Sequence, residues 1–452
     1  MACYADGSLR LSGRISPVVI RSLVSNSSGT GTRALATQID GIYLRNMICT
    51  SSLRRAASVL LFAVAPGFGQ PASQRKLHRL DGTTISVQDA EAFALKTLTD
   101  HHVTGVQLAV LTNGKLTWSY AFGLRHKNSD LPMTTDTTTW AASITKSVFA
   151  TYVMHLVETE NFQLDTPLAR QLPQPLDTYE PYRSTASELV KDPRWASVTP
   201  RMLLSHSSGL YNFAFIEPDK KMHLHFTPGT EFRYSGEGIN LVQFLIEQQK
   251  HAPIEDLMQA AIFSPLGMTH TGLIYRKEFD ANLADRFDLN EAFHAQTHRF
   301  PARAAGSMAT SVNDLVRFTT ALLDGKIITP KTMQEMLTPV FPIRTEHQFP
   351  IAANETNAAE AASTGLAYGV GWGLLTHTRF GPAFFKEGHG DGAQNYIVCF
   401  QRSRSCMILL TNSDNGELAF RPLLEHLLGD TITPWEWEGY TPAYIEASRK
   451  IQ

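Results

Sequence analysis

Cysteine is scarce and charge is low in this 452-residue chain. It has four cysteines, 18% charged residues and a formal net charge of −2, so it offers no basic field to nucleic acid. No uninterrupted apolar run reaches the length of a membrane span. No Cys/His cluster has metal-ligand spacing. With 43% hydrophobic residues, the composition is that of an ordinary soluble globular protein, for which we expect no metal and no cofactor.

The first seventy residues differ from the rest. The triplet Leu53-Arg54-Arg55, which contains two basic residues, precedes an apolar stretch of about ten residues. A cleavage-site pattern of small residues (small-x-small) follows, and this order is typical of a secretory signal peptide. We therefore predict a signal peptide over 47–69, translation from Met47, a tether over 70–80, and a secreted or periplasmic protein. Residues 1–46 are then an untranslated upstream extension or, alternatively, a disordered extension that is not cleaved.

Two cysteines, Cys399 and Cys406, remain after that segment. They flank a short polar turn between two apolar strands, so they can pair across the hairpin in an oxidising compartment. Pairing depends on a strand register that the sequence does not define. Of the two states, we favour two buried free thiols.

Apolar periodicity predicts one mixed sheet assembled from both ends of the chain. Residues 87–100 have helical periodicity, and a hairpin with the turn Asn113-Gly114 follows. Helical patterns dominate the middle, and strands return late. The segment 341–364 is interpreted as an exposed excursion without chemistry. The predicted units are an α/β domain from 81–160 and 300–435 and an inserted all-helical domain from 161–299.

The chemistry centres on Ser143 and Lys146, a Ser-x-x-Lys motif at the start of a predicted helix. Helical residues three apart share a face, so the amine can reach the hydroxyl. A serine hydroxyl needs a neighbouring base to become a good nucleophile. A helix N-terminus also favours developing negative charge and discourages protonation of a nearby amine. The motif alone is weak, because Ser73-Gln74-Arg75-Lys76 matches it too.

Further motifs follow Ser143 along the chain. They are His206-Ser207-Ser208-Gly209-Leu210, Tyr234 within Pro228–Gly236, Pro265-Leu266-Gly267-Met268, Ala305-Gly306-Ser307-Met308 and Gly388-His389-Gly390. This ordered set resembles the serine β-lactamase-like family, which comprises class C β-lactamases, penicillin-binding DD-peptidases and related serine esterases, over about 80–430. The resemblance implies an α+β fold of the β-lactamase/transpeptidase type, an antiparallel sheet flanked by helices with an inserted helical domain.

The resemblance also implies roles for individual residues. Ser143 matches the acylated nucleophile, Lys146 its amine partner, and Tyr234 a proposed general base or proton shuttle. His389 matches the start of the Lys-Thr-Gly motif, where many family esterases have histidine, and is expected to be a cation near Tyr234. The backbone N–H groups of Ser143 and Gly392 are then expected to form the oxyanion hole.

The expected substrate-binding positions are Gly236, Gly390 and Asp391. The chain departs from the family pattern at two of them, Gly236 and Asp391, and at His389. Gly236 replaces the Asn of Tyr-x-Asn and removes an amide that can bond a substrate amide. His389 replaces a permanently charged Lys, and Asp391 adds negative charge at a Gly position. These departures weaken the β-lactamase and peptidase interpretations more than the esterase one. His206 is interpreted as structural.

The sequence thus predicts an exported serine hydrolase that forms an acyl-enzyme on Ser143. An esterase or related acyl-transferase is favoured, and a β-lactamase or DD-peptidase is the alternative within the same family. A non-catalytic β-lactam- or peptidoglycan-binding scaffold is the alternative from another class. The expected partner is a small ester, amide or peptide-like substrate, without nucleic acid and without a stable membrane span after signal removal; the oligomeric state stays open.

Overall fold

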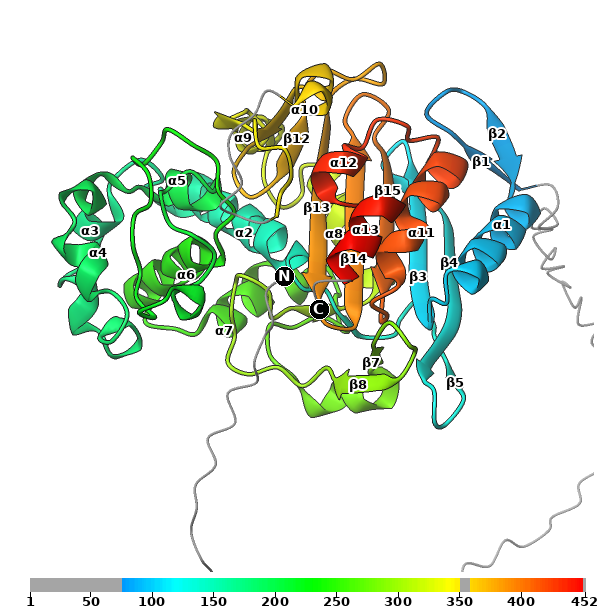
Figure 1. Ribbon diagram of the computed structural model, residues 1–452, viewed down its shortest axis with the longest axis horizontal. Helices are drawn as coiled ribbons and strands as arrows, with labels where there is room; N and C mark the ends of the chain where they lie inside the picture. Colours follow the sequence, from blue (N-terminus) through cyan, green and yellow to red (C-terminus); the bar gives the residue numbers. More distant parts are fainter. Residues whose placement is uncertain (1–74, 350–357, 450–452) are drawn as a thin grey trace, which may run out of the picture. The chain divides into compact units, whose positions relative to one another are not determined.

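The computed structural model describes residues 75–349 and 358–449 (Figure 1). In these residues a nine-stranded antiparallel sheet has the order β10-β11-β12-β13-β14-β15-β3-β4-β5. Early and late segments of the chain meet where β3 pairs with β15, as predicted. The strands are β3 Gly105–Thr112, β4 Lys115–His126, β5 Leu131–Pro132, β10 Phe341–Pro342, β11 Leu366–Tyr368, β12 Gly373–Leu375, β13 Ala383–Gly390, β14 Ala393–Phe400 and β15 Ser405–Thr411.

Helices flank both faces of this sheet. The larger ones are α1 Val87–Asp100, α2 Ile144–Glu160, α6 Gly236–Lys250, α8 Val312–Leu323 and α11 Gly416–Leu423. The shorter ones are α3 Leu168–Gln171, α4 Ser187–Lys191, α5 Pro200–Leu204, α7 Ile254–Met258, α9 Pro330–Met336, α10 Ala359–Thr364, α12 Trp435–Glu438 and α13 Pro442–Arg449. Three short strand pairs lie apart from the main sheet: β1 Lys76–His78 with β2 Thr84–Ser86, β6 Thr139–Trp140 with β9 Ala309–Thr310, and β7 Asp285–Phe287 with β8 Phe293–Gln296.

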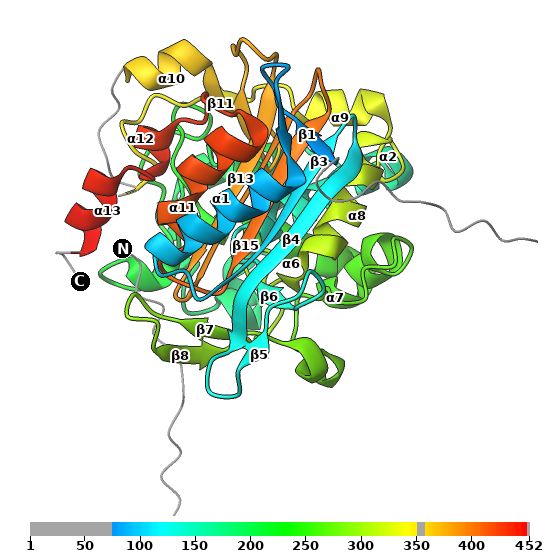
Figure 2. The same cartoon turned by 90° about the vertical axis from the view of Figure 1, so that its right-hand side faces the viewer.

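Alternation along the strands creates two apolar cores. Successive side chains of a strand point to opposite faces, so Leu108 packs in the core under α1 and α11, whereas Ala109 packs in the core under α2 and α8. Figure 2 shows α1 and α11 on one side of the sheet and α8 on the other. The antiparallel sheet flanked by helices predicted from the sequence is confirmed.

Three segments differ from their predicted character. The expected tether over 70–80 contains β1, because Leu77 is fully buried in the core. The segment 161–299 holds α3 to α7 and also the β7–β8 hairpin, where the prediction had helices alone. In the described parts of the segment 341–364 the chain is not wholly exposed, since Gln348 is only 2% exposed.

The predicted upstream extension and signal peptide lie outside the described residues. Within 75–349 and 358–449, no helix is both long enough and apolar enough to cross a membrane.

Cys399 and Cys406 form a disulfide, so the expectation of two free thiols is wrong. Cys399 on β14 lies directly opposite Cys406 on β15, with their Cα atoms 4.1 Å apart. Facing residues of neighbouring antiparallel strands are close enough to be bridged. The strand register, which the sequence did not define, decides the pairing.

Candidate active site

Ser143 is the N-cap residue of α2, and the chain is tightly held just before it. Ala142 has a φ of +45°, a left-handed backbone conformation that non-glycine residues rarely adopt without support. The support includes the N–H of Ala141, which donates to the carbonyl of Met308 at 2.9 Å. The strained turn presents the Ser143 side chain, which is half-buried, at the helix N-terminus.

Lys146 lies one helical turn after Ser143 and is 2% exposed. Its Nζ lies 2.8 Å from the Ser143 Oγ and donates to the Ala305 carbonyl at 2.5 Å. Burial, and then the nearby charge of Lys386, hold the Lys146 pKa well below its usual value, although Glu387 opposes the shift. A neutral amine in this position can accept the proton of the serine hydroxyl.

The Tyr234 ring lies close to two amines and is 4% exposed. The ring centroid is 4.8 Å from the Lys146 Nζ and 5.0 Å from the Lys386 Nζ. Lys386 also reaches the phenol oxygen, at 3.5 Å. The structure therefore brings Ser143, Lys146 and Tyr234 together, and it adds Lys386, which the sequence interpretation did not include.

His206 packs behind Tyr234, with the two ring centroids 4.5 Å apart. It is fully buried, and its Nδ1 accepts the Ser235 N–H at 3.2 Å. Burial first, and then the charges of Lys386 and Lys146, hold the His206 pKa well below its usual value. A neutral imidazole that positions the backbone beside Tyr234 fits the structural role expected for His206.

Lys386-Glu387-Gly388 occupies the place expected for the Lys-Thr-Gly motif. Lys386 faces Tyr234, and a Cβ on Gly388 would lie 2.4 Å from the Ala141 carbonyl oxygen. Only glycine lets β13 pass this close to the start of α2. The motif thus begins three residues earlier than we expected, and its Lys-x-Gly spacing is the signal that would have revealed it.

Lys386 and Glu387 form an ion pair inside the protein, with 0% and 2% of their side chains exposed. Gln348 donates to the same Glu387 Oε1 at 2.9 Å. Burial alone would raise the Glu387 pKa, but the charges of Lys386 and His389 hold it below its usual value. Lys386 therefore presents a largely neutralised positive charge to the site.

His389 contacts other groups than expected. Its Nε2 lies 2.8 Å from the Tyr440 hydroxyl, and its Nδ1 lies 3.4 Å from the Glu417 Oε1. The side chain is 27% exposed. The expectation that His389 is the cation beside Tyr234 is wrong, because Lys386 occupies that position.

Gly392 is also placed differently from the expectation. It lies in the two-residue turn between β13 and β14, and its N–H donates to Asp414 Oδ1 at 2.5 Å. This donor is engaged by a carboxylate, so the expected oxyanion role of Gly392 does not hold.

The strand pairing indicates a different backbone donor. Gly390 and Ala393 flank the tight turn as a hydrogen-bonded pair, and hydrogen-bonded and non-bonded pairs then alternate along the ladder. The N–H of His389 therefore points away from β14, toward the side of β12. Because β12 reaches only to Gly373, opposite Phe385, this N–H lies beyond the last pair of β12 with β13.

Of the three expected substrate-binding positions, two are glycines packed against aromatic rings, and the third lies in a turn. A Cβ on Gly390 would lie 2.2 Å from the Trp140 ring. Asp391 lies in the turn, its carbonyl accepts from Arg286 at 2.6 Å, and its side chain is 43% exposed. Gly236 is buried against Phe213.

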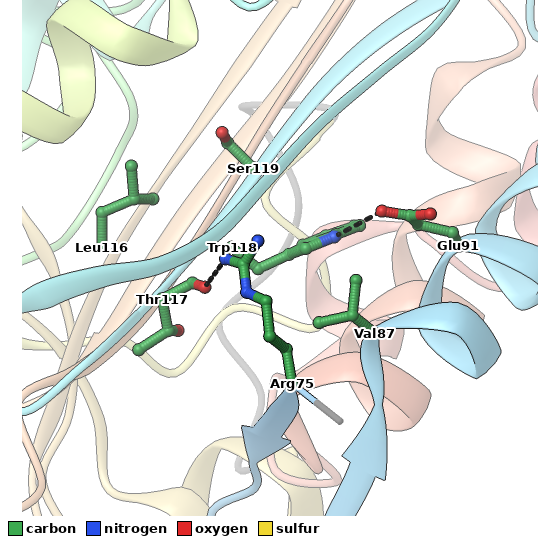
Figure 3. A pocket seen from close by; sticks show the side chains of 7 residues that line it. All are labelled: Arg75, Val87, Glu91, Leu116, Thr117, Trp118 and Ser119. Atoms are coloured by element: carbon green, nitrogen blue, oxygen red, sulfur yellow. Dashed lines mark hydrogen bonds between the residues drawn. The ribbon is translucent and has the colours of Figure 1, made fainter. Parts of the chain in front are cut away.

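A pocket of about 270 Å³ lies elsewhere, between α1 and β4 (Figure 3). Arg75 donates to the Thr117 carbonyl at 3.3 Å, and Trp118 donates to Glu91 at 3.4 Å across it. The strands β14, β15 and β3 separate β4 from β13 in the sheet, so this pocket is not part of the Ser143 site.

Comparison with known proteins places the chain in a family. The family profile described as Beta-lactamase matches residues 88–429. Penicillin-binding protein 4 of Amycolatopsis lactamdurans is 25% identical over 355 residues, covering 74% of this chain and 87% of that protein. Esterase EstB of Burkholderia gladioli is 25% identical over 228 residues, covering 43% of this chain and 55% of that protein.

Solved structures share the fold. The octameric penicillin-binding protein homologue from Pyrococcus abyssi superposes with a TM-score of 0.62 at 22% identity, covering 81% of each chain. The matched region 88–429 contains Ser143, Lys146, Tyr234 and Lys386. The chain belongs to the Beta-lactamase family, whose members are serine hydrolases.

Proposed function

We propose that this protein is a serine esterase that acts on neutral esters through an acyl-enzyme on Ser143. The observation that carries the proposal is the buried Lys386–Glu387 ion pair beside Tyr234. A substrate carboxylate would meet a cation whose charge is already balanced by Glu387, whereas a neutral ester needs no such cation.

The reaction begins with attack of the Ser143 Oγ on the ester carbonyl carbon. The hydroxyl proton passes to the Lys146 Nζ, 2.8 Å away, as the new C–O bond forms. The N–H groups of Ser143 and His389 stabilise the oxyanion. The bond to the leaving oxygen then breaks as that oxygen takes the Tyr234 hydroxyl proton, and the Lys146 ammonium returns its proton to the Tyr234 phenolate. Water then attacks the acyl carbon while the neutral Lys146 takes a proton from it. The bond to the Ser143 Oγ breaks, Lys146 gives that proton to the Oγ, and the acid is released.

The measurement compares kcat/KM for phenyl acetate and 3-acetoxybenzoate, which differ by one carboxylate on the leaving group. We expect the neutral ester to be preferred and the β-lactam nitrocefin to be turned over poorly. A higher kcat/KM for the carboxylate ester, or rapid nitrocefin turnover, would contradict this proposal and favour the β-lactamase or peptidase alternative.

Export is part of the proposal. It rests on the signal-like sequence over 47–69, and the Cys399–Cys406 disulfide supports it, because disulfides persist mainly in oxidising compartments. N-terminal sequencing of the protein secreted by its native host should find a start near Gln70. A start before Met47 would contradict it.

A further inference from the structure

An aromatic ring fills the place where the family motif carries an asparagine side chain. A Cβ on Gly236 would lie 2.3 Å from the Phe213 Cζ and 2.5 Å from its Cε1. Real Cβ atoms essentially never approach another heavy atom within 3.0 Å. With the Phe213 ring in this position, residue 236 has no room for a side chain.

The segment that carries this ring is fastened to the start of α6. The Gly236 N–H donates to the Asn212 side-chain oxygen at 2.8 Å, and the Glu237 N–H donates to the Asn212 carbonyl at 2.6 Å. The Ala214 N–H donates to a Glu237 carboxylate oxygen at 3.2 Å. Hydrogen bonds of the residues on both sides of Phe213 fix its backbone position.

The Phe213 ring belongs to an aromatic pair that reaches the surface. Gly236 follows Tyr234 by two residues, and the Tyr234 ring lies 4.8 Å from the amine of Lys146. Phe213 is 9% exposed and stacks on Phe215, with 5.1 Å between ring centroids and 12° between planes. Phe215 is 46% exposed, so the aromatic pair runs from the buried Phe213, packed against Gly236, to solvent.

We propose that Phe213 and Phe215 form the acyl subsite and that this subsite takes an aromatic acyl group. The inference rests on the proposed ester hydrolysis at Ser143. An aryl ring gains from offset or edge-to-face contact with another ring. An amide-bearing acyl group instead meets a hydrocarbon ring where an amide partner is expected, and its polar atoms lose hydrogen bonds.

The test uses the full chain and three 4-nitrophenyl esters that share a leaving group: the acetate, the 3-phenylpropanoate and the N-acetylglycinate. We expect the phenylpropanoate to have the highest kcat/KM. Replacing the ring in Phe213→Leu, which keeps an apolar side chain, should lower the phenylpropanoate/acetate ratio roughly two- to tenfold, the range of one aromatic contact.

A matched control is Phe93→Leu. Phe93 on α1 stacks on His426 with centroids 3.7 Å apart and packs against the core on the α1 and α11 face of the sheet. Its replacement should leave the ratio unchanged. A second variant, Phe213→Ala with Gly236→Asn, makes room for the family amide and should raise the N-acetylglycinate ester relative to the phenylpropanoate.

The outcomes separate the two proposals. An unchanged ratio in Phe213→Leu, with the acetate still hydrolysed by the unaltered protein, overturns the aromatic subsite alone. Absence of turnover of all three esters by a protein whose Ser143 still reacts with a fluorophosphonate overturns the esterase proposal, and the subsite falls with it.

Discussion

Lys386 and Glu387 are consecutive residues of β13, yet their side chains meet in the protein interior as an ion pair. Removing one member of a buried pair leaves an uncompensated charge, which typically costs about 3–5 kcal/mol. Gln348 donates to the same carboxylate oxygen that Lys386 contacts. The pair therefore constrains both the stability of the site and the charge that a substrate encounters.

Glu387→Thr should redirect the site toward carboxylate-bearing substrates. It restores a Lys-Thr-Gly sequence and releases the charge of Lys386. The ratio of kcat/KM for 3-acetoxybenzoate to that for phenyl acetate should rise about tenfold, as for a gained hydrogen bond to a charged group. Glu425→Thr removes an exposed carboxylate paired with Arg421 and is the control. An unaltered ratio in Glu387→Thr would show that the ion pair does not select substrates.

The pH dependence of kcat/KM should follow the protonation state of the Lys146 amine. Its amine must be neutral to accept the Ser143 proton, so kcat/KM for phenyl acetate should fall as pH drops through the Lys146 pKa and level off above it. Burial and Lys386 lower that pKa, and the opposing effect of Glu387 is smaller. Removing both charges in Lys386→Met with Glu387→Gln should therefore move the acidic limb to higher pH. A limb that stays in place would contradict the assignment of Lys146 as the base.

His389→Ala should change activity on neutral and carboxylate-bearing esters by the same factor. Its ring contacts Tyr440 and Glu417, and the group assigned to catalysis is its backbone N–H, which alanine retains. Measuring kcat/KM for both esters from about two pH units below neutrality to about two units above it checks this. A selective loss on the carboxylate ester would restore the cation role that the sequence suggested for His389.

Periodicity predicted the local elements well. The helix expected over 87–100 is α1, and the Asn113-Gly114 turn joins β3 and β4 as expected. Three-residue helical spacing also predicted the Ser143–Lys146 hydrogen bond. These features depend on residues that are close in sequence, so their spacing contains the information.

Contacts between distant segments could not be predicted in this way. The motif on β13 was placed three residues late, because the sequence offers both Lys386 and His389 as its first residue, and the approach of Gly388 to Ala141 decides between them. Gln348 lies in a stretch without periodicity, and its bond to Glu387 is purely tertiary. The fit of Phe213 against Gly236 likewise appears only in three dimensions.

The disulfide should contribute to stability. Cys399 and Cys406 are seven residues apart, and closing so short a loop stabilises a fold by about 2–3 kcal/mol in the chain-entropy account. Cys399→Ala with Cys406→Ala should lower the free energy of unfolding by about that amount, measured by urea denaturation. A reductant should destabilise the unaltered protein and not the double variant. Equal sensitivity of both proteins would contradict this.

The central claim is that Ser143 is the nucleophile. The most direct measurement is intact-mass analysis after exposure to a fluorophosphonate, with peptide mapping of the modified residue. The account predicts one adduct on Ser143, and none on a folded Ser143→Ala variant whose circular dichroism and Tm match those of the unaltered protein. An adduct on another serine, or undiminished labelling of Ser143→Ala, would contradict it.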